Sequence, residues 1–123
     1  MQVFDRNGKF ETQWINMAKP CGLFIDQSSE LVYVGELGVA IGPNSQAYGL
    51  GPRVSIMDTK GNTLARLGDG PEGINPGQFT APHGVCVDSH GDIYVGEVSW
   101  THSRRYANPP DEIRSLQKLV RKG

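Results

Sequence analysis

The sequence predicts an all-β fold made of repeated antiparallel strands. Short apolar or alternating segments are separated by turn residues, and no long segment shows helical periodicity. The chain of 123 residues contains 16 glycines and 8 prolines, and this glycine share is nearly twice the usual value of about 7%. Two segments about 61 residues apart also share one pattern, and such a sequence repeat predicts a repeated structural unit.

The repeat is clearest in two segments that each predict a pair of strands around a turn. Segment 20–36 reads PCGLFIDQSSELVYVGE, and segment 82–97 reads PHGVCVDSHGDIYVGE. The earlier segment has one additional residue, and Asp26 and Asp88 stand at the same place in the two segments. An Asp side chain at the end of a strand can bond the backbone of the following turn. We therefore expect a strand a, a turn and a strand b in each repeat, with a structural role for the aspartates.

Two more strands complete the unit. Segment 53–61, RVSIMDTKG, matches segment 3–8, VFDRNG, and a weaker echo occurs in segment 115–123, SLQKLVRKG. We label the strand in these segments c, and the strand after its turn d. The predicted strands are c-d in 1–17, a-b-c-d in 18–70 and a-b-c in 71–123.

The C-terminal segment 111–122 has two interpretations. The repeat predicts strand c there. Alternatively, Asp111 follows two prolines and could begin a helix, because apolar residues recur at helical spacing. Those residues are Ile113, Leu116, Leu119 and Val120. The repeat favours the strand.

Four antiparallel strands per repeat are typical of a β-propeller blade. Two blades cannot close a ring, and blades bury their faces only against neighbours. The chain is therefore either part of a longer propeller or a homo-oligomer, for which we favour a trimer with six blades. In that ring, the N-terminal c-d pair of one copy would complete the a-b strands of the next. An isolated copy would expose apolar faces and strand edges.

Charge and hydropathy exclude two classes of partner. The formal net charge is -1, so the chain lacks the basic excess of a nucleic-acid-binding surface. No apolar run approaches the roughly 18 residues of a membrane span. We therefore expect no nucleic-acid or membrane partner. No signal peptide follows Met1, which favours a cytoplasmic location.

Blade geometry predicts where a functional site would lie. Strand a is the innermost strand, and it begins at the face of the ring that carries the long connections 37–52, 68–81 and 98–114. Loops on a rigid frame often carry function, so we expect a binding face at this channel mouth. Cys21 and His83 stand at the start of strand a in the two repeats.

Segment 82–97 resembles the NHL repeat, whose pattern is roughly Pro-x-Gly-Val-x-Val-Asp followed by Gly-x-Ile-Tyr-Val-x-Asp. The resemblance covers residues 3 to about 120. The histidine before the first glycine is similar to that of the peptidyl-α-hydroxyglycine (peptidylamidoglycolate) lyases and their bacterial relatives, which are six-bladed propellers that use zinc and hold a structural calcium ion. This resemblance implies that His83 is a zinc ligand on the channel axis. The chain departs from that family because Cys21 replaces the histidine in the other repeat.

His83 and Cys21 are the candidate metal ligands. Catalytic zinc takes about three protein ligands, which three copies of His83 in a trimer would supply. Alternatively, His83 bonds a backbone carbonyl between blades, and Cys21 is a small buried thiol. Zinc is the expected ion, and calcium is the lesser expectation. Cys86 matches Phe24 in the repeat, so we expect Cys86 in the core and expect no disulfide.

The long connections also contain candidates for catalysis. Tyr48 and Tyr106 could act as general bases. Arg53 and Arg105 could hold a carboxylate through two hydrogen bonds. The alternative for each of the four is an ordinary exposed side chain.

Two glutamates, Glu36 and Glu97, end strand b in the two repeats. They could bind a cation at the rim of the channel. We favour a structural role, in which each glutamate caps a loop backbone or pairs with a neighbouring arginine.

Three functions remain open from the sequence. The first, implied by the resemblance, is a zinc-dependent lyase acting on a peptidyl-α-hydroxyglycine-like substrate. The second is a non-catalytic module that binds a protein, a peptide or a small molecule at the channel mouth, because a fold does not determine a function. The third is an inactive propeller fragment. The number of axial histidines per ring distinguishes the first function from the other two.

Overall fold

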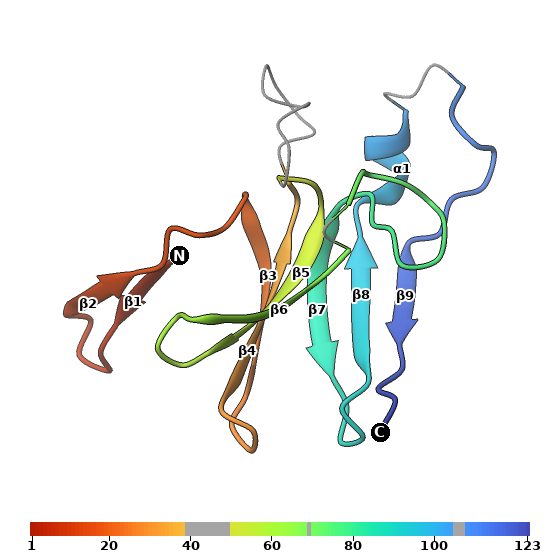
Figure 1. Cartoon of the computed structure of the whole chain (residues 1–123). Coiled ribbons are helices and arrows are strands. Elements are labelled where there is room, and N and C mark those ends of the chain that lie inside the picture. The colour runs from red at the N-terminus through yellow and green to blue at the C-terminus, as the bar shows by residue number, and fades with distance from the viewer. Residues whose placement is uncertain (39–49, 69, 105–107) are drawn as a thin grey trace.

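The described part of the chain consists of nine strands, one short helix and their connections (Figure 1). The structure is a computed structural model that describes residues 1–38, 50–68, 70–104 and 108–123. The elements are β1 (Gln2–Phe4), β2 (Phe10–Gln13), β3 (Pro20–Asp26), β4 (Leu31–Glu36), β5 (Arg53–Asp58), β6 (Thr63–Leu67), β7 (Pro82–Val87), β8 (Ile93–Glu97), α1 (Ser99–Ser103) and β9 (Leu116–Leu119). The predicted all-β class is confirmed, although the sequence did not lead us to expect α1.

The strands form three sheets, with the orders β1-β2, β3-β4-β5-β6 and β7-β8-β9. We term β3–β6 blade 1, β7–β9 blade 2 and β1–β2 the N-terminal hairpin. All pairings are antiparallel, so the sheets confirm propeller-type blades. In blade 2, Leu119 lies opposite Ile93 and Leu116 lies opposite Gly96. The C-terminal segment is therefore a strand, and the helix interpretation of that segment is wrong.

The N-terminal hairpin reproduces the β5–β6 pairing of blade 1. The pairs in the hairpin are Gln2–Gln13, Val3–Thr12 and Phe4–Phe10. The pairs in blade 1 are Ser55–Arg66, Ile56–Ala65 and Met57–Thr63. In both sheets one additional residue lies between the second and third pairs, and a bulge of this kind bends the strand and increases its twist. Therefore β1 and β2 occupy the places that β5 and β6 occupy in a complete blade.

The two blades lie side by side and share the larger core (Figure 1). Tyr33 and Val54 of blade 1 are buried in one cluster with Ile93 and Val95 of blade 2. Phe79, from the connection between the blades, is fully buried in the same cluster. Burying apolar side chains between sheets removes them from water and stabilises both blades together.

The outer faces of the blades are only partly covered. On the side of blade 1 away from blade 2, the buried residues Val32, Val34 and Met57 pack against Met1, Trp14 and Met17. Leu23 and Ile25 lie on that side too, because they pair with Val34 and Val32, and they are 52% and 54% exposed. On the side of blade 2 away from blade 1, Leu116 is 64% exposed.

Cys21 and Cys86 are free and exposed, so the expectation that Cys86 lies in the core is wrong, and so is the alternative interpretation of Cys21 as a small buried thiol. The reason for Cys86 is its place on blade 2. It pairs with Tyr94 on the open side of that blade, whereas Phe24 pairs with Tyr33 on the side that blade 2 covers.

Within the described residues, no helix is long and apolar enough to cross a membrane.

Candidate functional site

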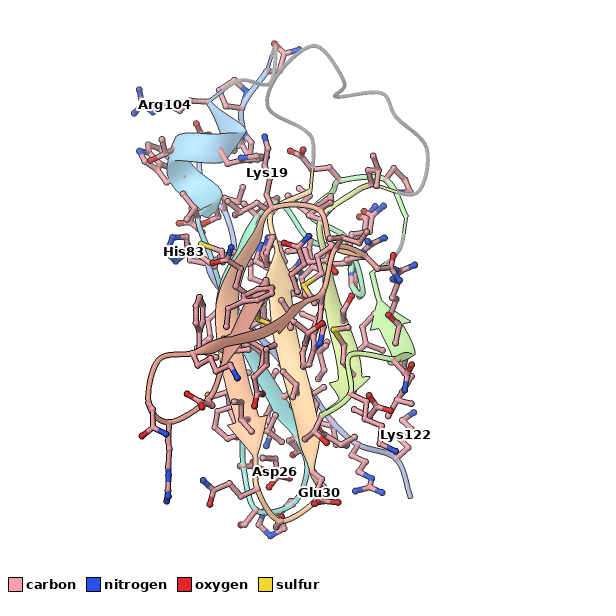
Figure 2. All side chains as sticks on the ribbon, turned by 90° about the vertical axis from the view of Figure 1, so that its left-hand side faces the viewer. Lys19, Asp26, Glu30, His83, Arg104 and Lys122 are labelled. Atoms are coloured by element: carbon pink, nitrogen blue, oxygen red, sulfur yellow. The ribbon has the colours of Figure 1, made fainter. Side chains whose placement is uncertain are left out.

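The long connections gather at one end of the blades. Figure 1 shows α1 and the connection before β7 at this end, and the β3–β4 and β7–β8 turns at the opposite end. Figure 2 likewise shows His83, Lys19 and Arg104 toward one end, and Asp26 and Glu30 at the other. We term the end with α1 the rim and define it by residues 70–81, 98–104 and 108–115. The rim is the end at which the sequence predicts a binding face.

Glu36 is buried at the end of β4 and binds the connection that precedes β3. Its carboxylate accepts a hydrogen bond from the backbone N–H of Ala18 at 2.6 Å and another from the hydroxyl of Ser55. The Nη2 atom of Arg53 lies 3.0 Å from Glu36 Oε2, and the two side chains are 2% and 0% exposed. The preferred interpretation of Glu36, a loop cap paired with an arginine, is confirmed. Arg53 therefore faces Glu36 inside the protein rather than an open channel mouth.

Glu97 plays the same part in blade 2 with neutral partners. Its Oε2 atom accepts hydrogen bonds from the backbone N–H of Thr80 at 2.6 Å, the hydroxyl of Thr80 at 3.0 Å and the backbone N–H of Ala81 at 3.2 Å. Its Oε1 atom accepts one from the amide of Gln117 at 2.7 Å. The structural interpretation of Glu97 is also confirmed.

The helix α1 is anchored to the rest of the rim. His102 is buried, and its Nε2 atom lies 3.1 Å from Glu72 Oε2 in the connection between the blades. At the other end of the helix, the hydroxyls of Ser99 and Ser115 share a hydrogen bond. The backbone N–H of Val98 donates to the carbonyl of Ala81 at 3.0 Å. Sequence reasoning missed this role of His102, since only the fold brings Glu72 to it.

Beside α1 the surface forms a hollow of about 320 Å3. Its lining residues are Trp100, Ser103, Arg104, Pro109, Pro110 and Asp111. The guanidinium carbon of Arg104 lies 4.8 Å from the centroid of the Trp100 ring, which is a cation–π contact. Trp100 nevertheless remains 49% exposed. Among its described lining residues, the hollow thus offers an aromatic and proline surface next to the cation of Arg104 and the carboxylate of Asp111.

The two predicted metal ligands lie on neighbouring strands. Cys21 and His83 are exposed near the starts of β3 and β7. These strands approach closely, because a Cβ atom added to Gly22 would lie 2.6 Å from the backbone oxygen of His83. However, in the described residues no three His, Cys, Asp or Glu side chains are grouped as a metal site. The described residues of one chain therefore do not bring together the three ligands that catalytic zinc takes.

Three other predicted site residues cannot be placed. Tyr48, Tyr106 and Arg105 lie outside the described residues, so their predicted roles stay predictions.

The opposite end of the blades is built from tight turns. Asp26 accepts hydrogen bonds from the hydroxyls of Ser29 and Ser28 at 2.6 and 2.7 Å. These bonds, first that from Ser29, lower the pKa of Asp26 from its ordinary 3.8 to about 2. Asp88 accepts from the backbone N–H of His90 and Asp92 at 2.9 and 3.0 Å. These aspartates have the structural role that the sequence predicts.

A model of the NHL repeat matches residues 79–103, a stretch that contains β7, β8 and α1. No curated protein matches the sequence. Together with the antiparallel four-stranded and three-stranded sheets, the match supports β-propeller blades of the NHL type, with the match itself confined to blade 2 and α1.

Proposed function

We propose that the chain is a propeller binding module whose ligand lies on the rim, in the hollow beside α1. The observation that carries this proposal is the exposed Trp100 stacked with Arg104. Tryptophan and arginine are the residues most enriched among those that dominate binding energies. The ligand we expect is a peptide or small molecule with an apolar group for Trp100 and an anionic group for Arg104.

The frame around the hollow supports this proposal. Buried His102 and the Ser99–Ser115 hydrogen bond hold α1 against the blade. A rigid frame lowers the entropy that binding costs, because fewer side chains and loops must be ordered by the ligand. Function in rigid scaffolds also concentrates on the loops that they carry.

Binding to an immobilised peptide library tests the proposal. We expect Trp100→Ala and Arg104→Ala each to lower the affinity for the captured peptides roughly 30-fold, which is the effect of losing a dominant interface residue. His90→Ala is the matched control, because its side chain is 85% exposed in the β7–β8 turn at the opposite end. Peptides that bind equally well to both rim variants, or that are lost with His90→Ala, would contradict a rim site.

Zinc-dependent lyase activity on a peptidyl-α-hydroxyglycine-like substrate is a second proposal, and it depends on assembly. The approach of β3 to β7 places Cys21 and His83 on neighbouring strands. The described residues of one chain do not group three zinc ligands, so we derive no metal-dependent step, and a ring of copies, for which we favour a trimer, would have to supply the other ligands. Elemental analysis of the assembled protein tests this. Absence of zinc would remove both residues as ligands, and zinc that is unaffected by His83→Ala would remove His83; calcium in the same sample would be scored separately.

A further inference from the structure

We propose that β9 of one chain pairs with β2 of a second copy of the chain. Among the described strands, β9 pairs only with β8, whereas its equivalent in blade 1, β5, lies between β4 and β6. An edge strand exposes a row of backbone N–H and C=O groups that a further strand can satisfy. Among the described strands, the edge of β9 that corresponds to the β6 side of β5 is therefore unpaired.

The internal repeat identifies β2 as the strand that fits this place. The hairpin and the β5–β6 pair share their register and the position of their bulge. Therefore β2 corresponds to β6, and β1 corresponds to both β5 and β9. The sequence predicted a ring in which both hairpin strands join the a-b strands of another copy. The structure requires a different pairing in that ring. Because β9 already occupies the place of strand c, only β2 can be added.

The N-terminal hairpin is poorly placed to retain β2. All four residues of β2 are exposed. Three residue pairs connect it to β1, and beside them the flanking Met1 and Trp14 exchange two backbone hydrogen bonds. The ring centroids of Phe4 and Phe10 lie 5.8 Å apart, but each residue is 50% exposed. An isolated two-stranded ribbon is marginally stable, whereas a strand added to an existing sheet with a buried face is not isolated. If β2 pairs with β9 of another copy in exchange for β1 of its own chain, it leaves a two-stranded sheet and joins a three-stranded sheet that has a buried face.

The exchange would also cover the apolar residues that a single chain leaves open. The linker from β2 to β3 is short, so β2 would bring blade 1 of the second copy against blade 2 of the first copy. The contact would resemble the one between blade 1 and blade 2 within a single chain. Leu23 and Ile25 of the second copy would then take the places that Val85 and Val87 have in the existing interface. Leu116, on the open side of blade 2, would be covered at the same time.

The pairing is intermolecular because of where the two strands lie. Figure 1 shows the N-terminal hairpin and β9 on opposite sides of the molecule, with blade 1 and the other strands of blade 2 between them. The chain would thus join head to tail, and each copy would contribute two complete blades. Such a contact forms a ring if its rotation closes.

Disulfide trapping tests the register. Transferring the pairs of the hairpin and of blade 1 to β9 places Thr12 opposite Lys118, and opposite Cα atoms lie about 4.5–5.5 Å apart, within disulfide range. In a Cys21→Ser, Cys86→Ser background, we expect Thr12→Cys with Lys118→Cys to form disulfide-linked oligomers under mild oxidation. The matched control is Thr12→Cys with Leu116→Cys, whose Cα atoms would lie diagonally and beyond that range. Equal cross-linking in both variants, or none in the first, overturns the proposal.

Gly84→Ala provides a second test that leaves the strands unchanged. A Cβ at Gly22 meets the backbone of His83, but a Cβ at Gly84 meets nothing within 4 Å in one chain. In the exchanged assembly, the equivalent neighbour of Gly84 is Cys21 of the second copy. By light scattering over a concentration series, we expect Gly84→Ala to weaken association about tenfold or more, with unchanged unfolding of the monomer. An unmodified chain that stays monomeric throughout the series, or association that Gly84→Ala does not change, overturns the proposal.

Discussion

Strands β3–β5 of blade 1 and β7–β9 of blade 2 pair in the same order and register. The two blades differ in the side chains of one face. Phe24 of blade 1 packs on the core between the blades, as does Ile56, and the equivalent residues of blade 2 are Cys86 and Lys118. Lys118 is 44% exposed, and its Nζ atom lies 2.8 Å from Asp92. The repeat therefore specifies which strands form, but it does not specify the side chains at equivalent positions of one face.

The same contrast holds inside the rim. Glu36 and Glu97 end equivalent strands and cap equivalent connections. Glu36 faces the buried cation of Arg53, but Glu97 faces the neutral amide of Gln117. Two copies of one loop cap are thus held by interactions of different kinds, and their removal should have different consequences.

The largest expected effect separates these two caps. Glu36→Gln removes the negative charge opposite a buried guanidinium, and breaking such a pair costs about 3–5 kcal/mol. Glu97→Gln keeps uncharged partners and should cost about 1–3 kcal/mol. The free energy of unfolding in denaturant measures both. Glu36→Gln with Arg53→Met should recover much of the loss, because the double variant no longer buries an unpaired charge. Equal losses in the two single variants would contradict the contrast.

An intermediate effect distinguishes two equivalent glycines. A Cβ on Gly22 would lie 2.6 Å from the backbone oxygen of His83, so Gly22→Ala forces the blades apart and should cost about 1–3 kcal/mol. Gly84→Ala should leave the thermal midpoint of the monomer nearly unchanged, since its Cβ meets open space. If the two substitutions destabilised the monomer equally, the contact between β3 and β7 would not be the reason for the effect.

The smallest expected effect concerns the turns. The folded pKa of Asp26, about 2, lies below its unfolded value of about 3.9. The stability that this carboxylate contributes is therefore present above about pH 4 and is lost as the pH falls toward 2. Ser29→Ala should raise the pKa of Asp26 toward 3.8, as NMR titration of the carboxyl carbon would show. Ser89→Ala in the equivalent turn should not change the pKa of Asp88, whose bonds come from His90, Asp92 and Tyr94. An unchanged Asp26 pKa in Ser29→Ala would contradict the role of that hydroxyl.

Much of the fold could be predicted because its signals are local. Alternating strands, Asp turns and one repeat predict the sheets of two, four and three strands. The structural roles of Glu36 and Glu97 could be predicted for the same reason, since both follow a strand end. The burial of Cys86 was predicted wrongly, because equivalence with Phe24 specifies its place on a strand but not what covers that strand.

The candidate site depended more on contacts between distant segments. The position of His83 and Cys21 at the channel mouth was predicted from the strand starts, and their role as metal ligands was implied by the family resemblance. Their placement on neighbouring strands depends on how blade 1 approaches blade 2. The hollow at Trp100 required α1, a five-residue helix without a sequence signal, which is held by Glu72 and Ser115 from other connections.

Strand order, turn chemistry and the repeat were thus determined by the sequence alone, because they depend on side-chain periodicity and on bonds within a few residues. The tertiary structure decided which of two equivalent faces is buried, which glutamate meets an arginine, and where a binding hollow lies. These features depend on packing between segments far apart in the chain, and two repeats with the same strand pattern acquire different roles because their neighbours differ.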